Sequence, residues 1–467
     1  MDSFSVNLEL LEKYNTQGPR YTSYPTAPVW HEGYTAKTHL AAIDDTNTDA
    51  CIAGSNHPLS LYAHLPFCEE RCLFCGCNVV ITKQKEQSEK YLDYLFREID
   101  LVANKINSKR EVCQFHWGGG TPTYLSPNQM ARLFSFQKER FNIRPDAEIA
   151  IEVDPRVTST EHIDALKELG FNRISLGVQD FESTVQESIN RIQPLKMTEE
   201  FVGYCRKQGF EGINFDLIYG LPHQTEKSFA NTVDEVIRLS PDRIALYNFA
   251  YLPQLLPHQK QIPENAMPDG HQKFKIFRQA IQAFCEAGYV YIGMDHFAKP
   301  SDELAQALKK GTLHRNFMGY TVNSGEDADL YGFGVSAISG LSRHFAQNVK
   351  KLSAYYEALD NNQLPVMRGY TLGDDDVLRQ KVILAILCNG CVDYAEFKQR
   401  FGVDFERYFH EALEHIRPMA MDGLLVFLDA GFQLTPLGRV FSRNIAMPFD
   451  AYLKQQQADR PTFSKTL

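Results

Sequence analysis

The chain carries four cysteines within one ten-residue stretch, Cys68 to Cys77, in the pattern C-x3-C-x2-C-x-C. Since the whole chain of 467 residues has only ten cysteines, packing of unligated core thiols explains this clustering poorly. Thiolates a few residues apart can wrap one soft metal centre, and zinc or an iron–sulfur cluster are the candidates. The spacing therefore predicts a metal site.

The rest of the sequence distinguishes between zinc and an iron–sulfur cluster. Structural zinc usually takes four protein ligands that arrive as two separated pairs, and no second C-x2-C or H-x3-H follows at the usual distance. This favours an iron–sulfur cluster. In a 4Fe-4S cluster, three thiolates from Cys68, Cys72 and Cys75 leave one iron open to hold a substrate. Cys77 is either a catalytic or redox group or a small buried thiol.

Further candidate residues follow other predicted strands. The glycine triplet Gly118–Gly120 follows the second strand; consecutive glycines let the main chain approach a ligand, although a tight turn would also use them. Glu152 ends the third strand, where a carboxylate can accept hydrogen bonds from ribose hydroxyls or simply lie at the surface. Gln179, Arg191 and Asp216 need either polar partners or a polar ligand if they are buried.

These residues lie in a part of the chain that alternates between strand-like and helix-like segments. Alternation of this kind predicts an α/β fold with a parallel sheet and right-handed crossovers. It does not separate a barrel from an open doubly wound sheet, and both place their sites at strand ends. The predicted strands are Leu59–Leu65, Val112–Trp117, Ala147–Val153, Asn172–Val178, Gly212–Tyr219 and Asp242–Phe249. The predicted helices are Ser88–Asn104, Ser126–Arg140, Ser159–Leu169, Thr198–Gln208 and Lys227–Leu239.

The two ends of the chain show different patterns. Residues 1–58 lack clear periodicity, and the Pro-punctuated stretch Gly18–Ala27 predicts an extended lid or packing arm. Residues 371–450 hold eight basic and twelve acidic side chains, so we expect a packing or covering role there rather than DNA binding. Three predicted helices and a hairpin suggest a small winged-helix arrangement in this region: Val377–Leu387, Tyr394–Gln399, Phe405–Arg417 and Leu424–Leu434.

Composition and charge exclude several classes of function. Hydrophobic residues make up 43% and charged residues 23% of the chain, as in ordinary globular proteins. A net charge of −10 disfavours a broad nucleic-acid or anionic-membrane surface, so we expect a small-molecule partner, no nucleic acid and no membrane. The start of the chain lacks a basic, apolar leader, and no run of about 18 apolar residues occurs, which predicts a cytoplasmic protein with reduced thiols. Heptads are absent, and we expect a monomer.

The spacing C-x3-C-x2-C is the signature of the radical S-adenosylmethionine (SAM) enzymes, which this sequence strongly resembles. The resemblance implies a 4Fe-4S cluster whose open iron is chelated by the amino and carboxylate groups of SAM. It also implies that an electron from the cluster cleaves SAM to methionine and a 5′-deoxyadenosyl radical, which takes hydrogen from a substrate. The glycine triplet matches the motif that holds the amino group of SAM. Phe74 stands where the family has an aromatic residue, which lies against adenine or packs near the cluster.

Within this superfamily the chain resembles the oxygen-independent coproporphyrinogen III oxidases from near residue 10 to its last residues. The resemblance implies an incomplete (β/α)6 radical-SAM barrel over residues 59–370. An N-terminal segment over residues 1–58 precedes it, and a mostly helical, winged-helix-like C-terminal domain over residues 371–467 follows. The motifs that carry the resemblance are Gly18–Ala27, Cys77-Asn78, His116–Thr123, Asn214–Pro222, His314–Phe317 and Gly334–Ser339.

The same resemblance implies a substrate and a reaction. Two propionate side chains of coproporphyrinogen III would lose carbon dioxide and become vinyl groups, giving protoporphyrinogen IX without oxygen. Two rounds would use two SAM molecules. The resemblance assigns no catalytic residue and identifies neither the external electron donor nor the acceptor. To the first SAM it assigns Tyr62, Gly119, Glu152 and Ile338, and to the second Phe74, Gly120, Thr121, Gln179, Arg191, Asp216 and Ala250.

One residue departs from the family, and one residue type suits the substrate. Met318 stands where family sequences have Gln, and a methionine cannot donate the hydrogen bond that a glutamine amide can. The substrate bears four carboxylates, which planar guanidinium groups bind at two points. Arg20, Arg173, Arg315 and Arg343 are candidates, although each taken singly fits an ordinary ion pair better.

Two other functions are compatible with the cysteines. The related heme chaperone shares the barrel and cluster but performs no decarboxylation. Its motif continues Cys-Asp-Phe where this chain has Cys75-Gly76-Cys77-Asn78, and it lacks the Gly18–Ala27 stretch. A non-catalytic, metal-stabilised binding protein would need neither the glycine triplet nor the strand-end polar residues. A brown, air-sensitive protein would exclude structural zinc.

Overall fold

A computed structural model describes residues 8–48, 57–322 and 328–453, together with residues 463 and 466. The chain divides into two compact units. None of the described helices is long and apolar enough to span a membrane. The larger unit contains every residue that the motifs assign to a metal or cofactor; it comprises His31–Gly288 and Asn323–Thr371. The smaller unit comprises Met1–Trp30, Tyr289–Val322 and Leu372–Leu467.

The larger unit is built on a mixed sheet, so the predicted α/β fold is confirmed. Its six central strands are parallel neighbours in chain order: β1 (Leu59–Leu65), β4 (Glu111–Gly119), β5 (Asn142–Val153), β6 (Arg173–Gln179), β7 (Gly212–Tyr219) and β8 (Arg243–Asn248). Beyond β1 the sheet continues through the parallel strand β13 (Asp329–Phe333) and the antiparallel strands β14 (Ile338–Leu341), β15 (His344–Asn348) and β16 (Val366–Thr371).

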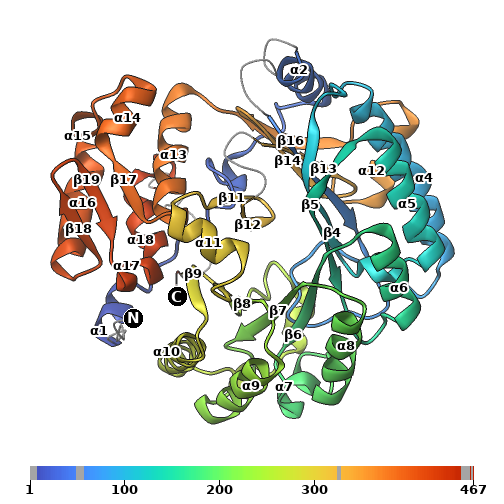
Figure 1. The fold of residues 1–467 in the computed structure, drawn as a ribbon, viewed down its shortest axis with the longest axis horizontal. Helices are drawn as coiled ribbons and strands as arrows, with labels where there is room; N and C mark the ends of the chain where they lie inside the picture. The colour runs from blue at the N-terminus through green and yellow to red at the C-terminus, as the bar shows by residue number, and fades with distance from the viewer. Residues whose placement is uncertain (1–7, 49–56, 323–327, 454–462, 464–465, 467) are drawn as a thin grey trace. The chain divides into compact units, whose positions relative to one another are not determined.

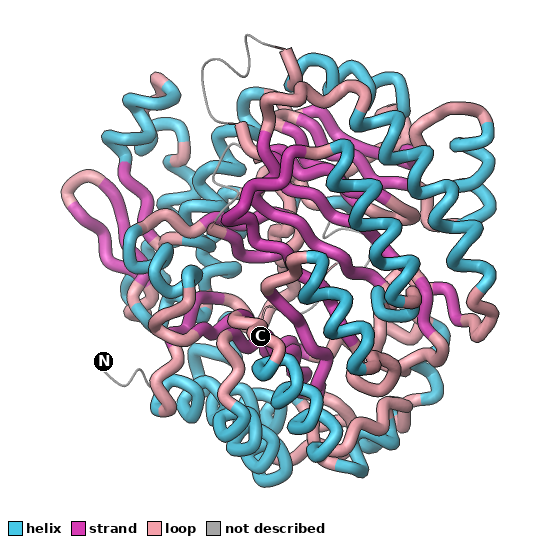
Figure 2. The backbone as a smooth tube through the Cα atoms, turned by 45° about the vertical axis from the view of Figure 1, so that its right-hand side comes forward, coloured by secondary structure: helices cyan, strands magenta, loops and turns pink. Residues whose placement is uncertain are grey.

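Helices connect these strands and cover the sheet. Figure 1 shows α4, α5 and α6 lying side by side along the central strands, and Figure 2 shows the helices as a layer over the strands. The connecting helices are α4 (Glu86–Ala103), α5 (Pro127–Arg140), α6 (Thr160–Leu169), α8 (Leu195–Lys207) and α9 (Glu226–Leu239), all of which were predicted within a few residues. The sequence pattern did not predict the short helix α7 (Ser183–Ser188), which lies between β6 and α8.

Local sequence explains the ends of these helices and their packing. Ser126 caps the start of α5 in a reciprocal capping box with Gln129, while Gly170 ends α6 in a left-handed conformation (φ 96°). On β4, the buried side chain of Trp117 packs against Phe171, with ring centroids 4.9 Å apart. Neighbouring side chains on a strand point to opposite faces, so His116 points away from this aromatic core.

The smaller unit is mostly helical in its C-terminal part. The predicted helix over residues 405–417 is interrupted: α15 (Phe405–Tyr408) ends before α16 (His410–Met421) begins. The predicted hairpin is present as β18 (Leu425–Leu428) and β19 (Gly431–Leu434), and an additional strand, β17 (Cys391–Asp393), pairs with β19. The Gly18–Ala27 stretch is packed within this unit, because Arg443 donates to the Gly18 and Pro19 carbonyls and Tyr21 donates to Asp450.

Candidate active site

A cavity of about 570 Å³ lies at the carboxyl ends of β4 to β7 in the larger unit. The end of each strand contributes to its wall, which is where parallel α/β folds place their sites. Most of the predicted site residues line it: Cys68, Cys72, Phe74, Cys75, Gly119, Gly120, Thr121, Glu152, Gln179, Arg191 and Asp216. Cys77 also lines the cavity.

The cysteine loop follows β1 and begins with a short strand, β2 (Phe67–Cys68), that pairs with β3 (Val80–Ile81). Burial raises the pKa of the Cys68 thiol to about 11, whereas a hydrogen bond from Cys77 lowers the pKa of the Cys75 thiol to about 7. Among the described residues, no three metal-ligating side chains converge on a single ion. The four thiols of the loop line one cavity.

Two residues that the sequence pattern did not reveal contact backbone carbonyls of this loop. His258 Nε2 lies 2.8 Å from the carbonyl oxygen of Cys75. The fully buried Gln259 donates from its amide to the carbonyls of Ala250 (3.2 Å) and Phe74 (3.4 Å). Gln259 therefore links the cysteine loop to Ala250, which itself lies outside the cavity wall. Gln259 lies in a short 3-10 helix (Pro257–Gln261), whose sequence carries no pattern that would have predicted this role.

The glycine triplet closes one side of the cavity. Gly118 and Gly119 are the last residues of β4 rather than residues that follow it, so only Gly120 lies beyond the strand. Gly119 has φ 117°, and a Cβ there would stand 2.6 Å from the His64 ring. Its N–H donates to Glu152 Oε2 (3.0 Å). At Gly120 a Cβ would stand 2.6 Å from the Pro66 backbone. Both positions therefore need glycine.

Two carboxylates face the cavity in different electrostatic states. Glu152 has 43% of its side chain exposed; burial opposes ionisation, but the His116 ring and the Gly119 N–H hold its pKa below the ordinary value. Asp216 has its pKa raised to about 6 by burial and by the Glu152 carboxylate, although Asn214 and Ser175 donate hydrogen bonds to it. Glu152 is therefore a ready acceptor for hydroxyl donors.

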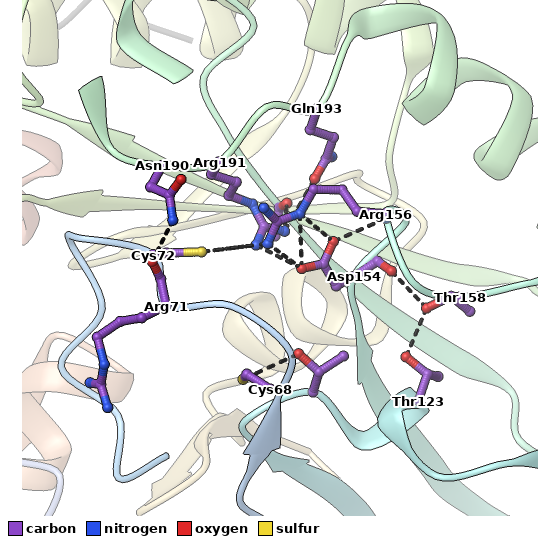
Figure 3. Close-up of polar contacts among 12 residues, drawn as sticks. Cys68, Arg71, Cys72, Thr123, Asp154, Arg156, Thr158, Asn190, Arg191 and Gln193 are labelled. Atoms are coloured by element: carbon purple, nitrogen blue, oxygen red, sulfur yellow. Dashed lines mark hydrogen bonds and ion pairs between the residues drawn. The ribbon is translucent and has the colours of Figure 1, made fainter. Parts of the chain in front are cut away.

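A chain of polar contacts connects Cys72 with the strand ends (Figure 3). The Asp154 carboxylate accepts from Arg156 Nη2 (2.7 Å) and Arg191 Nη1 (3.0 Å). Burial alone would raise the pKa of Asp154, but these two guanidinium groups lower it. Arg191 also donates to the Gly177 carbonyl (2.6 Å), while its Nε is buried without a hydrogen-bond partner in the described structure. An orphaned donor of this kind fits a ligand acceptor.

Three of the predicted cofactor residues do not line the cavity wall: Ala250, Tyr62 and Ile338. The Tyr62 ring stacks on the His116 ring at 5.9 Å, and His116 Nε2 lies 3.4 Å from Glu152 Oε1. Ile338 begins β14, directly after the turn that starts at Gly334. Tyr62 is thus connected to the cavity wall through the His116 side chain.

A buried carboxylate on α4 holds that turn in place. Glu98 is 3% exposed and accepts hydrogen bonds of 2.6 Å from the Gly334 N–H, the Asn348 amide and the Tyr355 hydroxyl. Tyr91, also on α4, donates to the carbonyl of His64 on β1 (2.7 Å). Burial raises the pKa of Glu98 to about 7, although its three donors act in the opposite direction. This helix therefore fixes both β1 and the turn before Ile338.

The raised pKa of Glu98 predicts a pH-dependent stability. The folded state binds the proton more tightly than the unfolded state, so the contribution is full below the unfolded pKa near 4.5 and is lost as the pH rises to about 7. The loss amounts to about 3 kcal/mol. Glu98→Gln should flatten this slope in urea unfolding followed by tryptophan fluorescence, whereas Glu89→Gln on the exposed side of α4 should retain it. Equal slopes in all three proteins would refute the assignment.

The arginine candidates for substrate binding differ in their surroundings. Arg173 is paired with the carboxylate of Glu148 (2.9 Å), and Arg20 forms an ion pair with Asp295 in the smaller unit. Arg315 lies over the ring of Tyr320 at 5.0 Å, and its Nε and Nη1 are buried without hydrogen-bond partners in the described structure. Of these three arginines, Arg315 is the one whose buried guanidinium nitrogens include atoms without a hydrogen-bond partner in the described structure.

Met318 lies in the turn of the hairpin formed by β11 (His314–Asn316) and β12 (Gly319–Thr321) in the smaller unit. Its N–H donates to Asn316 Oδ1 (2.9 Å), so the Asn316 side chain and the Met318 N–H stabilise the turn without help from the side chain at position 318. A methionine in place of glutamine is therefore compatible with the turn itself.

Comparisons with known proteins agree with the family resemblance of the sequence. Residues 62–236 match the model of the radical SAM superfamily, and residues 372–441 match the HemN C-terminal domain. The oxygen-independent coproporphyrinogen III oxidase of Salmonella typhimurium is 45% identical over 99% of this chain and 98% of its own length. That of Synechocystis sp. is 44% identical over 98% of this chain and 97% of its own length.

A solved structure closely resembles the structure of this chain. It is described as "Coproporphyrinogen III oxidase (HemN) from Escherichia coli is a Radical SAM enzyme". The two structures superpose with a TM-score of 0.89 at 43% sequence identity, over 96% of this chain and 99% of the other. The similarity therefore covers both compact units as well as the cysteine loop.

Proposed function

Because this chain belongs to the oxygen-independent coproporphyrinogen III oxidases of the radical SAM superfamily, we propose that it converts coproporphyrinogen III to protoporphyrinogen IX. It is a radical SAM enzyme of heme and porphyrin biosynthesis. Each of two propionate side chains would give up one β-hydrogen atom to the radical derived from SAM, lose carbon dioxide and pass one electron to an external acceptor, and would thereby become a vinyl group without oxygen. The observation that carries this proposal is the identity of 45% over nearly the full length of both chains.

Membership of the superfamily implies a 4Fe-4S cluster and SAM, and the cavity fits them. Cys68, Cys72 and Cys75 would hold three irons of the cluster and leave the fourth open to SAM. When bound, the two groups supply a one-electron cleavage of SAM that lets hydrogen be taken from a substrate carbon. The three thiols line one cavity, with Gly119 and Gly120 on its wall. Ligation requires deprotonated thiols, so metal binding must release the proton that Cys68 holds tightly.

The remaining predicted site residues would bind two SAM molecules. Gly119 and Glu152, together with Tyr62 and Ile338, would hold the first; the exposed Glu152 carboxylate is suited to accept from ribose hydroxyls. The second would lie against Phe74, Gly120, Thr121, Gln179, Arg191, Asp216 and Ala250. For this second site, the buried and unpartnered Nε of Arg191 supplies a donor for an acidic group.

The finer architecture is part of the same proposal. The six parallel strands β1 and β4 to β8 would form the incomplete (β/α)6 barrel, within a catalytic domain over residues 59–370. Residues 1–58 would serve as an N-terminal segment, and residues 371–467 would form the winged-helix-like domain. Helices α13 (Asp374–Cys388) and α14 (Tyr394–Phe401), with the β17–β19–β18 sheet, support this interpretation.

Product analysis under anaerobic conditions tests the proposed reaction. The protein is reconstituted with iron and sulfide, then supplied with dithionite, SAM and coproporphyrinogen III, and the products are identified by mass spectrometry. We expect protoporphyrinogen IX, lighter by two carbon dioxide equivalents and four hydrogens, together with methionine and 5′-deoxyadenosine. Formation of 5′-deoxyadenosine with unchanged porphyrinogen would contradict the substrate. Tight heme binding in that case would point to the chaperone function.

A further inference from the structure

Arg156 is a residue of the site that no motif assigns, and its guanidinium group reaches Cys72. It follows β5 in the turn Asp154-Pro155-Arg156 and pairs with the Asp154 carboxylate at two points, Nε to Oδ1 at 3.0 Å and Nη2 to Oδ2 at 2.7 Å. The same Nη2 donates to Cys72 Sγ at 3.5 Å. Figure 3 shows Cys72 on one side of the two guanidinium groups and Asp154 on the other.

A second guanidinium group approaches the same sulfur. Arg191 Nη1 lies 3.7 Å from Cys72 Sγ and 3.0 Å from Asp154 Oδ2. Both arginines thus share one carboxylate and one thiol. Two positive groups and one negative group leave a surplus positive charge beside Cys72, in a setting where Asp154 is 6% exposed and Arg191 is 7% exposed. Charges in such surroundings are screened little by water.

The Asp154 carboxylate also accepts from the Arg156 N–H (Oδ1, 3.0 Å), and hydrogen bonds to its carbonyl fix the backbone of the turn, so the guanidinium groups are oriented. The Asp154 carbonyl accepts from the N–H groups of Val157 and Thr158 (both 3.1 Å) and from the Thr158 hydroxyl (2.7 Å). The Thr158 hydroxyl lies 2.7 Å from that of Thr123, which follows the glycine triplet. The turn after β5 is therefore tied to the loop after β4.

We propose that Arg156, oriented by Asp154 and acting together with Arg191, raises the reduction potential of the iron–sulfur cluster through its hydrogen bond to the Cys72 sulfur. Reduction adds one electron from an external one-electron donor to the cluster; no covalent bond forms or breaks and no proton moves. The added negative charge is shared with the ligand sulfurs, so N–H donors and positive charge there stabilise the reduced form. The inference rests on the proposed ligand role of Cys72.

The test is an anaerobic redox titration of the reconstituted protein, with dithionite as reductant and the paramagnetic signal of the reduced cluster as readout. In Arg156→Met, we expect the ratio of reduced to oxidised cluster at a fixed potential to fall about tenfold, which is a decrease of about 59 mV in midpoint potential for a one-electron couple. Arg156→Lys keeps the charge without the two-point geometry and should lie between Arg156→Met and the wild type.

Arg144 supplies a matched control at the other end of β5. It pairs with Asp146 through the same two-point contact across one intervening residue (2.9 and 2.6 Å) but does not line the cavity. Arg144→Met should leave the midpoint potential unchanged. An unchanged midpoint in iron-loaded Arg156→Met would overturn the proposal. A second result would also overturn it: Arg156→Met binds no iron, and Arg156→Lys keeps the wild-type midpoint potential. Arg156 would then serve assembly of the cluster rather than its potential. Full iron content in Cys72→Ala would instead remove the ligand assignment.

Discussion

Cys68→Ala, Cys72→Ala and Cys75→Ala should each lose the 4Fe-4S cluster and all measurable cleavage of SAM. The three thiols line one cavity, and an alanine supplies no ligand for an iron. A cluster with only two protein ligands would expose further irons to solvent, so we expect near-complete loss rather than partial activity. Iron and sulfide analysis after anaerobic reconstitution, combined with assay of 5′-deoxyadenosine, measures both effects.

Cys77→Ala is the matched control for these three variants, because Cys77 lines the same cavity only two residues from Cys75. It should retain the full iron content. The control compares iron content and not activity, because the thiol hydrogen bond that lowers the pKa of Cys75 would be lost. Loss of iron from Cys77→Ala, or its retention in any of the other three variants, would show that the ligands are wrongly assigned.

Gly120→Ala is expected to have the second-largest effect, because its Cβ would meet backbone rather than a movable side chain. The nearest atoms are the Pro66 carbonyl carbon and oxygen at 2.6 and 2.7 Å and the Phe67 oxygen at 2.8 Å. The Gly120 N–H also donates to the Leu65 carbonyl (2.9 Å). To make room, the segment that leads into Cys68 must move, which displaces the first ligand of the cluster.

We expect Gly120→Ala to lower the rate of SAM cleavage by about a hundredfold, as misplacement of reacting groups by about 1 Å does. The free energy of unfolding should fall by about 1–3 kcal/mol, the usual cost of overpacking. Gly203→Ala on α8 is the control: its Cβ would meet nothing within 4 Å, so activity should be unchanged. Wild-type activity in Gly120→Ala would refute the close approach of β4 to the cysteine loop.

The sequence predicted the buried parallel strands best. The observed bounds of β1 (Leu59–Leu65) and β7 (Gly212–Tyr219) equal the predicted ones, because a strand buried on both faces forms a short apolar run with clear ends. The strand β5 starts five residues earlier than predicted, at Asn142. Of its first five residues, Asn142, Arg144 and Asp146 are polar and none is fully buried, so they carry no pattern of a buried strand. The observed end of β4 includes two glycines, which sequence patterns assign to turns.

Contacts between distant parts of the chain could not be predicted in this way. Arg156 meets Cys72 only because the end of β5 and the cysteine loop lie beside each other in the fold. Glu98 is different, since it lies seven residues after Tyr91 and three after Leu95 on α4, both of them buried. Helical periodicity therefore places this carboxylate on the apolar face, and a polar residue there signals a buried network.

Hydrogen transfer from the substrate is the most direct test of the radical decarboxylation assigned to this chain. Coproporphyrinogen III carrying deuterium at the β-carbons of its propionate side chains is incubated anaerobically with the reconstituted enzyme, dithionite and SAM. We expect one deuterium in each 5′-deoxyadenosine and two such molecules for every protoporphyrinogen IX formed. Unlabelled 5′-deoxyadenosine, or vinyl groups formed without its release, would contradict the radical decarboxylation assigned to this chain.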